Sequence, residues 1–178
     1  MYKDVIDFWF TELSPKQWWH KDPELDSIIQ QRFEKLLLKA KAAELFSWRD
    51  SPLGSLAEVI VLDQFSRNIY RDKAEAFACD AMALVLAQVA ISKGFDQQLP
   101  DEQRAFLYMP FMHSESAMIH VEAVELLSRL SNKNNLAFEY QHKAIIDKFG
   151  RYPHRNNILQ RQSTALELEF LQQPNSSF

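Results

Sequence analysis

The sequence is poor in the residues that build tight turns, disulfides and basic surfaces. It has three glycines in 178 residues, which leaves little material for β-hairpins or for glycine-rich phosphate-binding loops. Its single cysteine, Cys79, cannot form an internal disulfide, and we expect it to be a small buried core residue rather than a nucleophile. The net charge of −4 and the pI of about 5.7 argue against general nucleic-acid binding.

Signals for export or membrane insertion are also missing. The N-terminal MYKDVIDFWF lacks a basic region followed by a long apolar stretch. No run was expected to approach the ~18 apolar residues of a membrane span. We therefore predict a cytoplasmic protein with no membrane partner and no nucleic-acid partner.

Helix signals are frequent along the chain, whereas convincing strand alternation is absent. Helix starts are indicated at Asp22–Glu24 and Pro100–Glu102, where proline and acids occupy the first turn, and Thr164–Glu167 matches a capping box. Gly94 and Gly150 mark helix ends. The sequence predicts one all-α domain over residues 1–178, with about eight or nine helices. At Pro110 we expect a break or a kink between RAFLYM and PFMHSES.

The stretch from Ser55 to Arg71, SLAEVIVLDQFSRNIYR, is predicted to be the central helix. At 100° per residue it is apolar on two sides, as in a helix buried within a larger protein. Asp63 and Arg67 continue one of the apolar arcs, so both should point inward, where their i,i+4 spacing allows an ion pair. Asp80, further along the chain, is another acid next to an apolar face.

Polar residues gather in three otherwise apolar segments: LDQFSRNIYR, PFMHSES and FGRYPHRN. Through VLDQFSRNIYR, FLYMPFMHSE and FGRYPHRN, in this order and spacing, the chain resembles the bacterial domain-of-unknown-function family 924. The resemblance implies a TPR-like stack of antiparallel helical hairpins, with no assigned reaction. The chain departs from the family pattern at Gln160 and at Ala165-Leu166, which affects a turn and a helix start but none of the polar segments.

Because buried polar groups need partners, we expect the three segments to converge on an internal polar pocket that binds a small anionic molecule. A histidine (His113 or His154) and a carboxylate (Asp63 or Glu115) would be available for proton transfer. The candidate ligand-binding residues are Asp63, Gln64, Arg67, Asn68, Arg71, His113, Glu115, Arg151, His154, Arg155 and Asn156.

RYPHRN offers the strongest argument for an anion site. Pro153 suits the first position of a helix, which would place His154, Arg155 and Asn156 at a helix N-terminus with free N–H groups. In the alternative interpretation, Arg151 and Arg155 cap neighbouring helices or pair with Asp147 and Glu115.

No metal or cofactor is expected. Asp63, His113, Glu115 and His154 are the conceivable ligands, but they show no recognised ligand spacing. His20, His120 and His142 have no supporting cluster and are interpreted as surface or packing residues.

Three functional hypotheses remain open. The chain is a binding protein or enzyme for a small anionic molecule, a TPR-like module that binds a partner's peptide in a helical groove, or a protein whose polar cluster is purely structural. Acyl transfer has no positive support, because no G-x-S-x-G pattern is present.

Overall fold

The computed structural model describes residues 1–174 and 176, and these residues are helical without any strand. The predicted all-α fold is therefore confirmed. The α-helices are α1 (Tyr2–Asp7), α2 (Pro23–Lys41), α3 (Pro52–Ile60), α4 (Ser66–Ile69), α5 (Asp80–Ser92), α6 (Asp101–Met112), α7 (Ala117–Ser128), α8 (Asn134–Phe149) and α9 (Ala165–Leu171). Two π-helical turns, η1 (Phe8–Glu12) and η3 (Val61–Phe65), and four 3₁₀ turns, η2 (Phe46–Asp50), η4 (Ala74–Phe77), η5 (Asp96–Gln98) and η6 (Pro153–Arg155), complete the set.

The helix ends use the local chemistry that the sequence indicates. The Asp22 carboxylate accepts hydrogen bonds from the first backbone N–H groups of α2. Thr164 and Glu167 cap each other's backbone at the start of α9, and Gly150 ends α8 with a φ of +69°. Pro110 does not end the helix, because α6 continues to Met112, so of the two expected outcomes the break does not occur. Every residue from Ala105 to Met112 is buried, so the packing of this turn outweighs the backbone hydrogen bond that proline removes.

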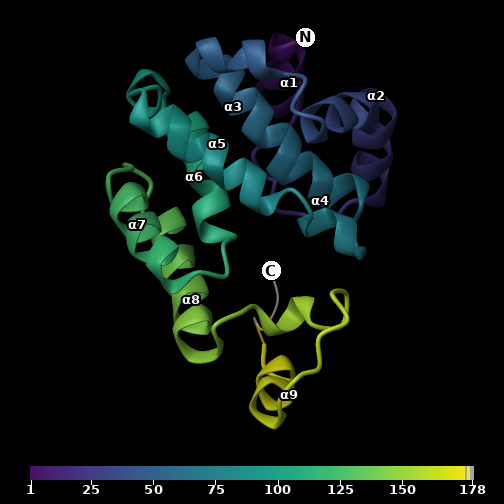
Figure 1. Ribbon diagram of the computed structural model, residues 1–178, viewed down its shortest axis with the longest axis vertical. Helices are drawn as coiled ribbons and strands as arrows, with labels where there is room; N and C mark the ends of the chain where they lie inside the picture. The colour runs from purple at the N-terminus through teal and green to yellow at the C-terminus, as the bar shows by residue number, and fades with distance from the viewer. Residues whose placement is uncertain (175, 177–178) are drawn as a thin grey trace.

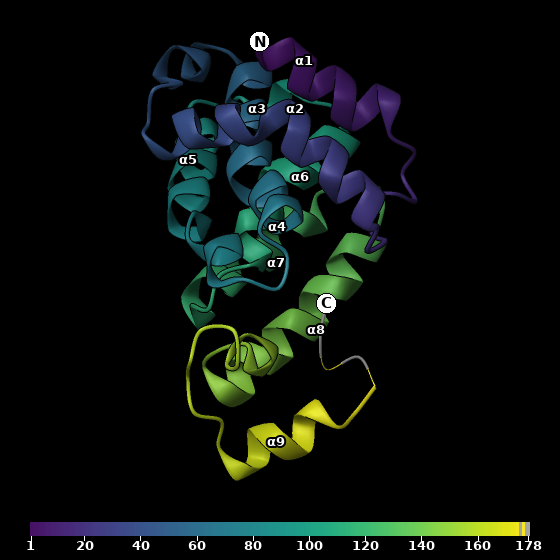
Figure 2. The same ribbon diagram turned by 90° about the vertical axis from the view of Figure 1, so that its right-hand side faces the viewer.

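The N-terminal helices lie at one end of the molecule and α9 lies at the other (Figures 1 and 2). Helix α3 is central: it packs against α1, η2, α5 and α6, and all its residues from Gly54 to Ile60 are buried. The main core extends from α1 to α7 and includes Trp9, Phe65 and Leu107, whose side chains are fully enclosed. This rigid packing fixes the end of α3 and the turn that follows it.

The C-terminal segment folds back beneath α8 and has a small core of its own. Ile145, Ile146 and Tyr152 form this core, with Phe149 and Phe170 packed against it. Figure 1 shows η6 and α9 below the body formed by α1–α4. The side chains of α4, α5, α6 and the RYPHRN segment therefore make the contacts between the two parts.

One stretch departs from the expectation of no membrane-length apolar run. Residues Ala74–Ser92, which comprise η4 and α5, are long and apolar enough to cross a bilayer by length and composition. The feature is a weak indication by itself, because core helices of globular domains meet the same criterion. In this fold one side of α5 packs into the core through Ala83, Ala87 and Ala90.

Candidate functional site

The central helix contains a π-helical turn at the position of its polar residues. The predicted regular helix is divided into α3, η3 and α4, and η3 carries Asp63 and Gln64. Side chains from α4 satisfy the backbone here: Ser66 Oγ donates to the Leu62 carbonyl at 2.6 Å, and Arg67 Nη1 donates to the Asp63 carbonyl at 2.8 Å. Single π-helical turns within α-helices frequently coincide with functional sites.

Asp63 points inward, as predicted, and is fully buried. Its carboxylate accepts hydrogen bonds from Arg67 Nη1 at 3.1 Å and from Gln64 Nε2 at 2.6 Å. His113 Nδ1 lies 2.8 Å from the same carboxylate. Burial opposes ionisation of Asp63, but the neighbouring Arg67 and His113 outweigh it and hold its pKa below the usual range. Asp63 is therefore ionised at neutral pH.

His113 follows directly after α6 and is oriented by Asp63. Burial and the charge of Arg67 lower its pKa, so the imidazole is neutral at neutral pH. Since Asp63 is an acceptor, the ring proton belongs on Nδ1. Among the described residues, no group is hydrogen bonded to the other nitrogen, Nε2, and the side chain is 17% exposed. Nε2 therefore presents a lone pair that can accept a proton or a hydrogen bond.

Asp80 links the central helix to the C-terminal segment. It accepts hydrogen bonds from Arg67 Nη2 at 3.0 Å and from Arg155 Nη1 at 3.2 Å. Arg155 also donates to the His113 carbonyl at 3.1 Å. We call Asp63, Arg67, Asp80, His113 and Arg155 the polar centre. The three polar segments thus meet, and Asp80 joins them although it was outside the predicted set.

Arg155 is a buried guanidinium with an incomplete set of partners. It lies between the rings of Phe77 and Tyr152, with its central carbon 4.6 Å from each ring centroid. Its Nε is buried and has no hydrogen-bond acceptor among the described residues. Burial and the charge of Arg67 lower its pKa. The positive charge of Arg155 is therefore only partly compensated by its surroundings.

Asn68 and Arg71 lie outside the polar centre, contrary to prediction. Arg71 donates from Nε and Nη2 to the two carboxylate oxygens of Asp26 in α2, at 2.5 and 2.7 Å. Asn68 Nδ2 donates to the same carboxylate at 2.8 Å. We call these three residues the Asp26 brace. Their polar groups are directed toward α2 because Asp26 supplies the acceptors there.

Glu115 and Asn156 also serve the structure of the C-terminal segment. The Glu115 carboxylate accepts from Arg161 Nη1 and Nη2, at 2.6 and 2.9 Å, and from the Tyr152 backbone N–H at 2.8 Å. Burial opposes its ionisation, but these partners lower its pKa. Asn156 bonds to Arg161 and Ser163. Arg161 was missing from the prediction, although it immediately follows the departure from the family pattern at Gln160.

Arg151 does not reach the polar centre either. It pairs through Nε and Nη2 with both oxygens of Glu167 in α9, at 2.6 and 2.8 Å. The alternative of a pair with Asp147 or Glu115 is wrong, since Asp147 pairs with Lys143 and Glu115 with Arg161. Arg151 thus holds α9 in place.

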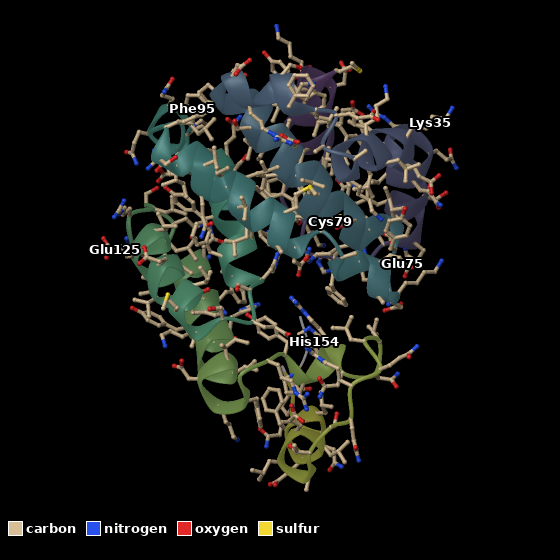
Figure 3. The ribbon with its side chains drawn as sticks, in the orientation of Figure 1. Lys35, Glu75, Cys79, Phe95, Glu125 and His154 are labelled. Carbon is tan, nitrogen blue, oxygen red and sulfur yellow. The ribbon has the colours of Figure 1, made fainter. Side chains whose placement is uncertain are left out.

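The predicted helix N-terminus in RYPHRN is not formed as an anion site. Pro153 begins only the three-residue 3₁₀ turn η6, and the N–H of Tyr152 before it is taken by Glu115. His154 lies between the C-terminal segment and the part of the molecule that carries Cys79 and Glu75 (Figure 3). Burial and the charge of Arg155 lower its pKa to about 4, so His154 is neutral at neutral pH.

Two surface cavities, of about 230 and 390 Å³, are not lined by residues of the polar centre. They lie instead along α1, α2 and η1, and Arg32 lines both. Within residues 1–174 and 176, no group of three or more histidine, cysteine, aspartate or glutamate side chains is placed to hold a metal ion. Burial raises the pKa of Cys79, which makes its thiol a poor nucleophile.

The formal charges of the polar centre balance at neutral pH. Asp63 and Asp80 compensate Arg67 and Arg155, and His113 is neutral. The arrangement offers a proton acceptor, His113 Nε2. The neighbouring arginines already donate most of their hydrogen bonds to groups within the polar centre. An anion that enters must therefore share or replace the bonds of Asp80.

Comparisons with known proteins show the family and the fold of the chain. The model of a bacterial protein family of unknown function, DUF924, matches residues 5–175. A solved structure of a protein of unknown function from Agrobacterium tumefaciens, ATU0120, superposes with a TM-score of 0.91 at 36% sequence identity, covering 96% of each chain. No curated protein matches the sequence.

Proposed function

The chain belongs to the bacterial protein family DUF924, and from the geometry of its polar centre we propose that it binds a small anionic molecule there. The ligand would carry a carboxylate or a phosphate group, and His113 Nε2 would accept a hydrogen bond or a proton from it. This proposal names a ligand class and a site, and it assigns no reaction.

The observation that carries the proposal is the environment of Arg155. Its Nε has no acceptor among the described residues, and its pKa is lowered by burial and by Arg67. A buried donor without an acceptor costs ~1–3 kcal/mol, and more when it is charged. An incoming anion would supply the missing acceptor through a charge-assisted hydrogen bond.

The ligand must meet His113 in its neutral form. Asp63 fixes the ring through Nδ1, which leaves Nε2 as the ring nitrogen available to a ligand. A histidine oriented by a carboxylate in this way is a suitable proton acceptor. Binding of a protonated carboxylic acid or hydrogen phosphate would therefore be coupled to proton transfer to His113.

Thermal denaturation with sodium phosphate and sodium citrate tests this proposal, with sodium chloride at matched ionic strength as the control. An anion at a hundred times its dissociation constant should stabilise the protein by ~2.7 kcal/mol. In parallel, NMR titration should show that His113 shifts on anion addition while the exposed His20 does not. Equal effects of chloride and citrate, or shifts confined to His20, would refute specific binding.

A second candidate is a TPR-like interaction module, and the outer side of α5 favours it. Met82, Val85 and Val89 are exposed there, with Val85 55% exposed, and the helix carries no charged residue between Asp80 and Lys93. Exposed apolar helix faces are typical of interaction surfaces. If α5 pairs with a second copy, sedimentation should depend on concentration for the wild type and lose this dependence in Val85→Glu. Identical, concentration-independent sedimentation of both proteins would remove this candidate.

A further inference from the structure

A second buried polar network adjoins the polar centre at the end of α6. The C-terminal end of α6 leaves backbone carbonyls without helical partners, as every helix end does. Here three successive carbonyls are each bonded by a side chain from elsewhere. Tyr152 Oη donates to Met112 O at 2.5 Å, Arg155 Nη2 donates to His113 O at 3.1 Å, and His120 Nε2 lies 2.8 Å from Ser114 O. The backbone on both sides of His113 is thereby held.

His120 is fully buried in α7 and has an acceptor at each ring nitrogen. Nε2 faces the Ser114 carbonyl, and Nδ1 lies 2.7 Å from Oε1 of Glu139 in α8. Glu139 is also fully buried, and its other carboxylate oxygen has no hydrogen-bond partner among the described residues. Of the two sequence-based interpretations of His120, surface or packing, the structure supports packing, but His120 also has polar partners that the sequence analysis did not expect.

The contacts of His120 and Glu139 require more protons than a neutral imidazole and an ionised carboxylate carry. A neutral imidazole carries one N–H, so with an ionised Glu139 one ring nitrogen would direct its lone pair at an acceptor less than 3 Å away. Tyr152 Oη lies 3.3 Å from Nε2, but its single proton is already donated to Met112 O. One further proton, on either the ring or the carboxyl group, gives both contacts of the ring a hydrogen-bond donor.

We infer that the buried His120–Glu139 pair retains one extra proton at neutral pH and thereby acts as a positioning element for His113. The proton is located either in an imidazolium–carboxylate pair or in a neutral imidazole beside a carboxylic acid. Both forms keep a proton on Nε2 and leave the pair without net charge, which low-dielectric surroundings favour. The relevance to ligand binding rests on the proposed function, whereas the proton itself does not.

The surroundings of the pair support retention of this proton. Burial raises the pKa of Glu139, although His120 and Lys143 act in the opposite direction. Lys143 and His142 of α8 and Tyr152 of the RYPHRN segment are the other titratable groups around the pair, with Glu115 and Arg155 beyond Tyr152. Burial holds His142 neutral, with a pKa of about 3, and raises the pKa of Tyr152. Neither of these two groups therefore changes charge around neutral pH.

The extra proton gives stability a definite dependence on pH. In the unfolded chain a glutamate titrates near ~4.3 and a histidine near ~6.5, so above pH ~6.5 the unfolded pair has lost the proton that the folded pair retains. The contribution of the pair is complete at about pH 6.5. It then decreases as pH rises, by about tenfold in the folding equilibrium constant per pH unit, until the folded pair also loses its proton.

Glu139→Gln tests this inference, because a glutamine amide can donate to Nδ1 while Nε2–H still donates to Ser114 O. This variant should fold without the extra proton, and its stability should lose the tenfold-per-unit decrease between pH 6.5 and 8.5. The matched control is Glu122→Gln, at an exposed glutamate of α7, which should keep the wild-type slope. Equal slopes in wild type and Glu139→Gln would overturn the inference.

A ligand-free NMR measurement on the wild type is independent of how any variant folds. The His120 Nε2 should carry a proton at pH 7, and loss of the extra proton of the pair at higher pH should shift the His113 resonances in the wild type but not in Glu139→Gln. An unprotonated Nε2 at pH 7 would overturn the inference, and so would His113 resonances that move alike in both proteins. Neither measurement uses phosphate or citrate, so its outcome can be distinguished from a failure of the proposed anion binding.

Discussion

The polar centre and the Asp26 brace both contain residues of the short motif LDQFSRNIYR, yet they differ in how far their hydrogen-bonding groups are satisfied. In the brace, the Asp26 carboxylate accepts three hydrogen bonds from Asn68 and Arg71. In the polar centre, Arg155 retains an unmatched buried donor and His113 retains an open nitrogen. The presence of arginine and carboxylate is therefore no sign of a site. What distinguishes a candidate site is the bonding capacity left after the structural pairs are formed.

The largest expected effect is that of Arg67→Ala, which should destabilise the protein by ~3–5 kcal/mol because it leaves the buried Asp63 without its cation. Urea denaturation measures this loss, and Asp63→Asn/Arg67→Gln should recover part of it. Arg129→Ala, which removes an exposed pair with Glu125, should cost less than ~1 kcal/mol. A comparably small loss for Arg67→Ala would mean that the polar centre is solvated.

Arg155→Ala should destabilise by about 2–3 kcal/mol, since it removes charged hydrogen bonds to Asp80 and His113 and the stacking on Phe77 and Tyr152. Urea denaturation of Arg155→Ala and Arg155→Lys separates the contribution of the charge from that of the stacking, because lysine keeps the charge without the planar stacking. An unchanged unfolding free energy in Arg155→Ala would contradict the observed packing.

Histidine burial predicts a loss of stability in mild acid. The folded-state pKa values of His154 and His142, about 4 and about 3, lie below the unfolded value of ~6.5, and that of His113 is also lowered. The unfolded state therefore binds more protons as pH falls below ~6.5, and stability decreases in that direction. His154 alone should account for about 2 kcal/mol by pH 5.

Urea denaturation between pH 7 and 5 measures this decrease before Asp63 begins to titrate. His154→Asn should reduce the slope, whereas the exposed His20→Asn should leave it unchanged. A stability that is flat over this range would show that His154 is protonated without cost.

The sequence supports prediction of the fold further than prediction of the site. Helix starts at Asp22 and Thr164 and the inward direction of Asp63 follow from local rules, which operate over a few residues. The partners of Arg71 and Arg151, namely Asp26 and Glu167, are 45 and 16 residues away, and no spacing rule selects them over nearer acids. The π-helical turn at Asp63 and the pairing of His120 with Glu139 likewise arise from tertiary packing.

Arg71→Ala should cost about 1–2 kcal/mol, because the brace is partly exposed and Asp26 can be hydrated when its partner is lost. Its value lies in the comparison with the polar centre. If the two regions have separate roles, Arg71→Ala should retain the thermal stabilisation by citrate or phosphate. Loss of the anion response in this variant would place the anion at the brace instead.

The smallest effect on stability is expected from His113→Asn, and this variant separates binding from structure. The histidine is partly exposed and its removal breaks one hydrogen bond to Asp63, which still has Arg67 and Gln64, so the cost should be about 1 kcal/mol. The ligand response should nevertheless disappear, because Nε2 is the open group that the proposed anion contacts. Calorimetric titration with citrate at constant ionic strength compares the wild type with His113→Asn, and His20→Asn serves as the matched control. If His113→Asn binds citrate as the wild type does, the open nitrogen has no part in recognition. His113 then makes only a structural contact, as the residues of the Asp26 brace do.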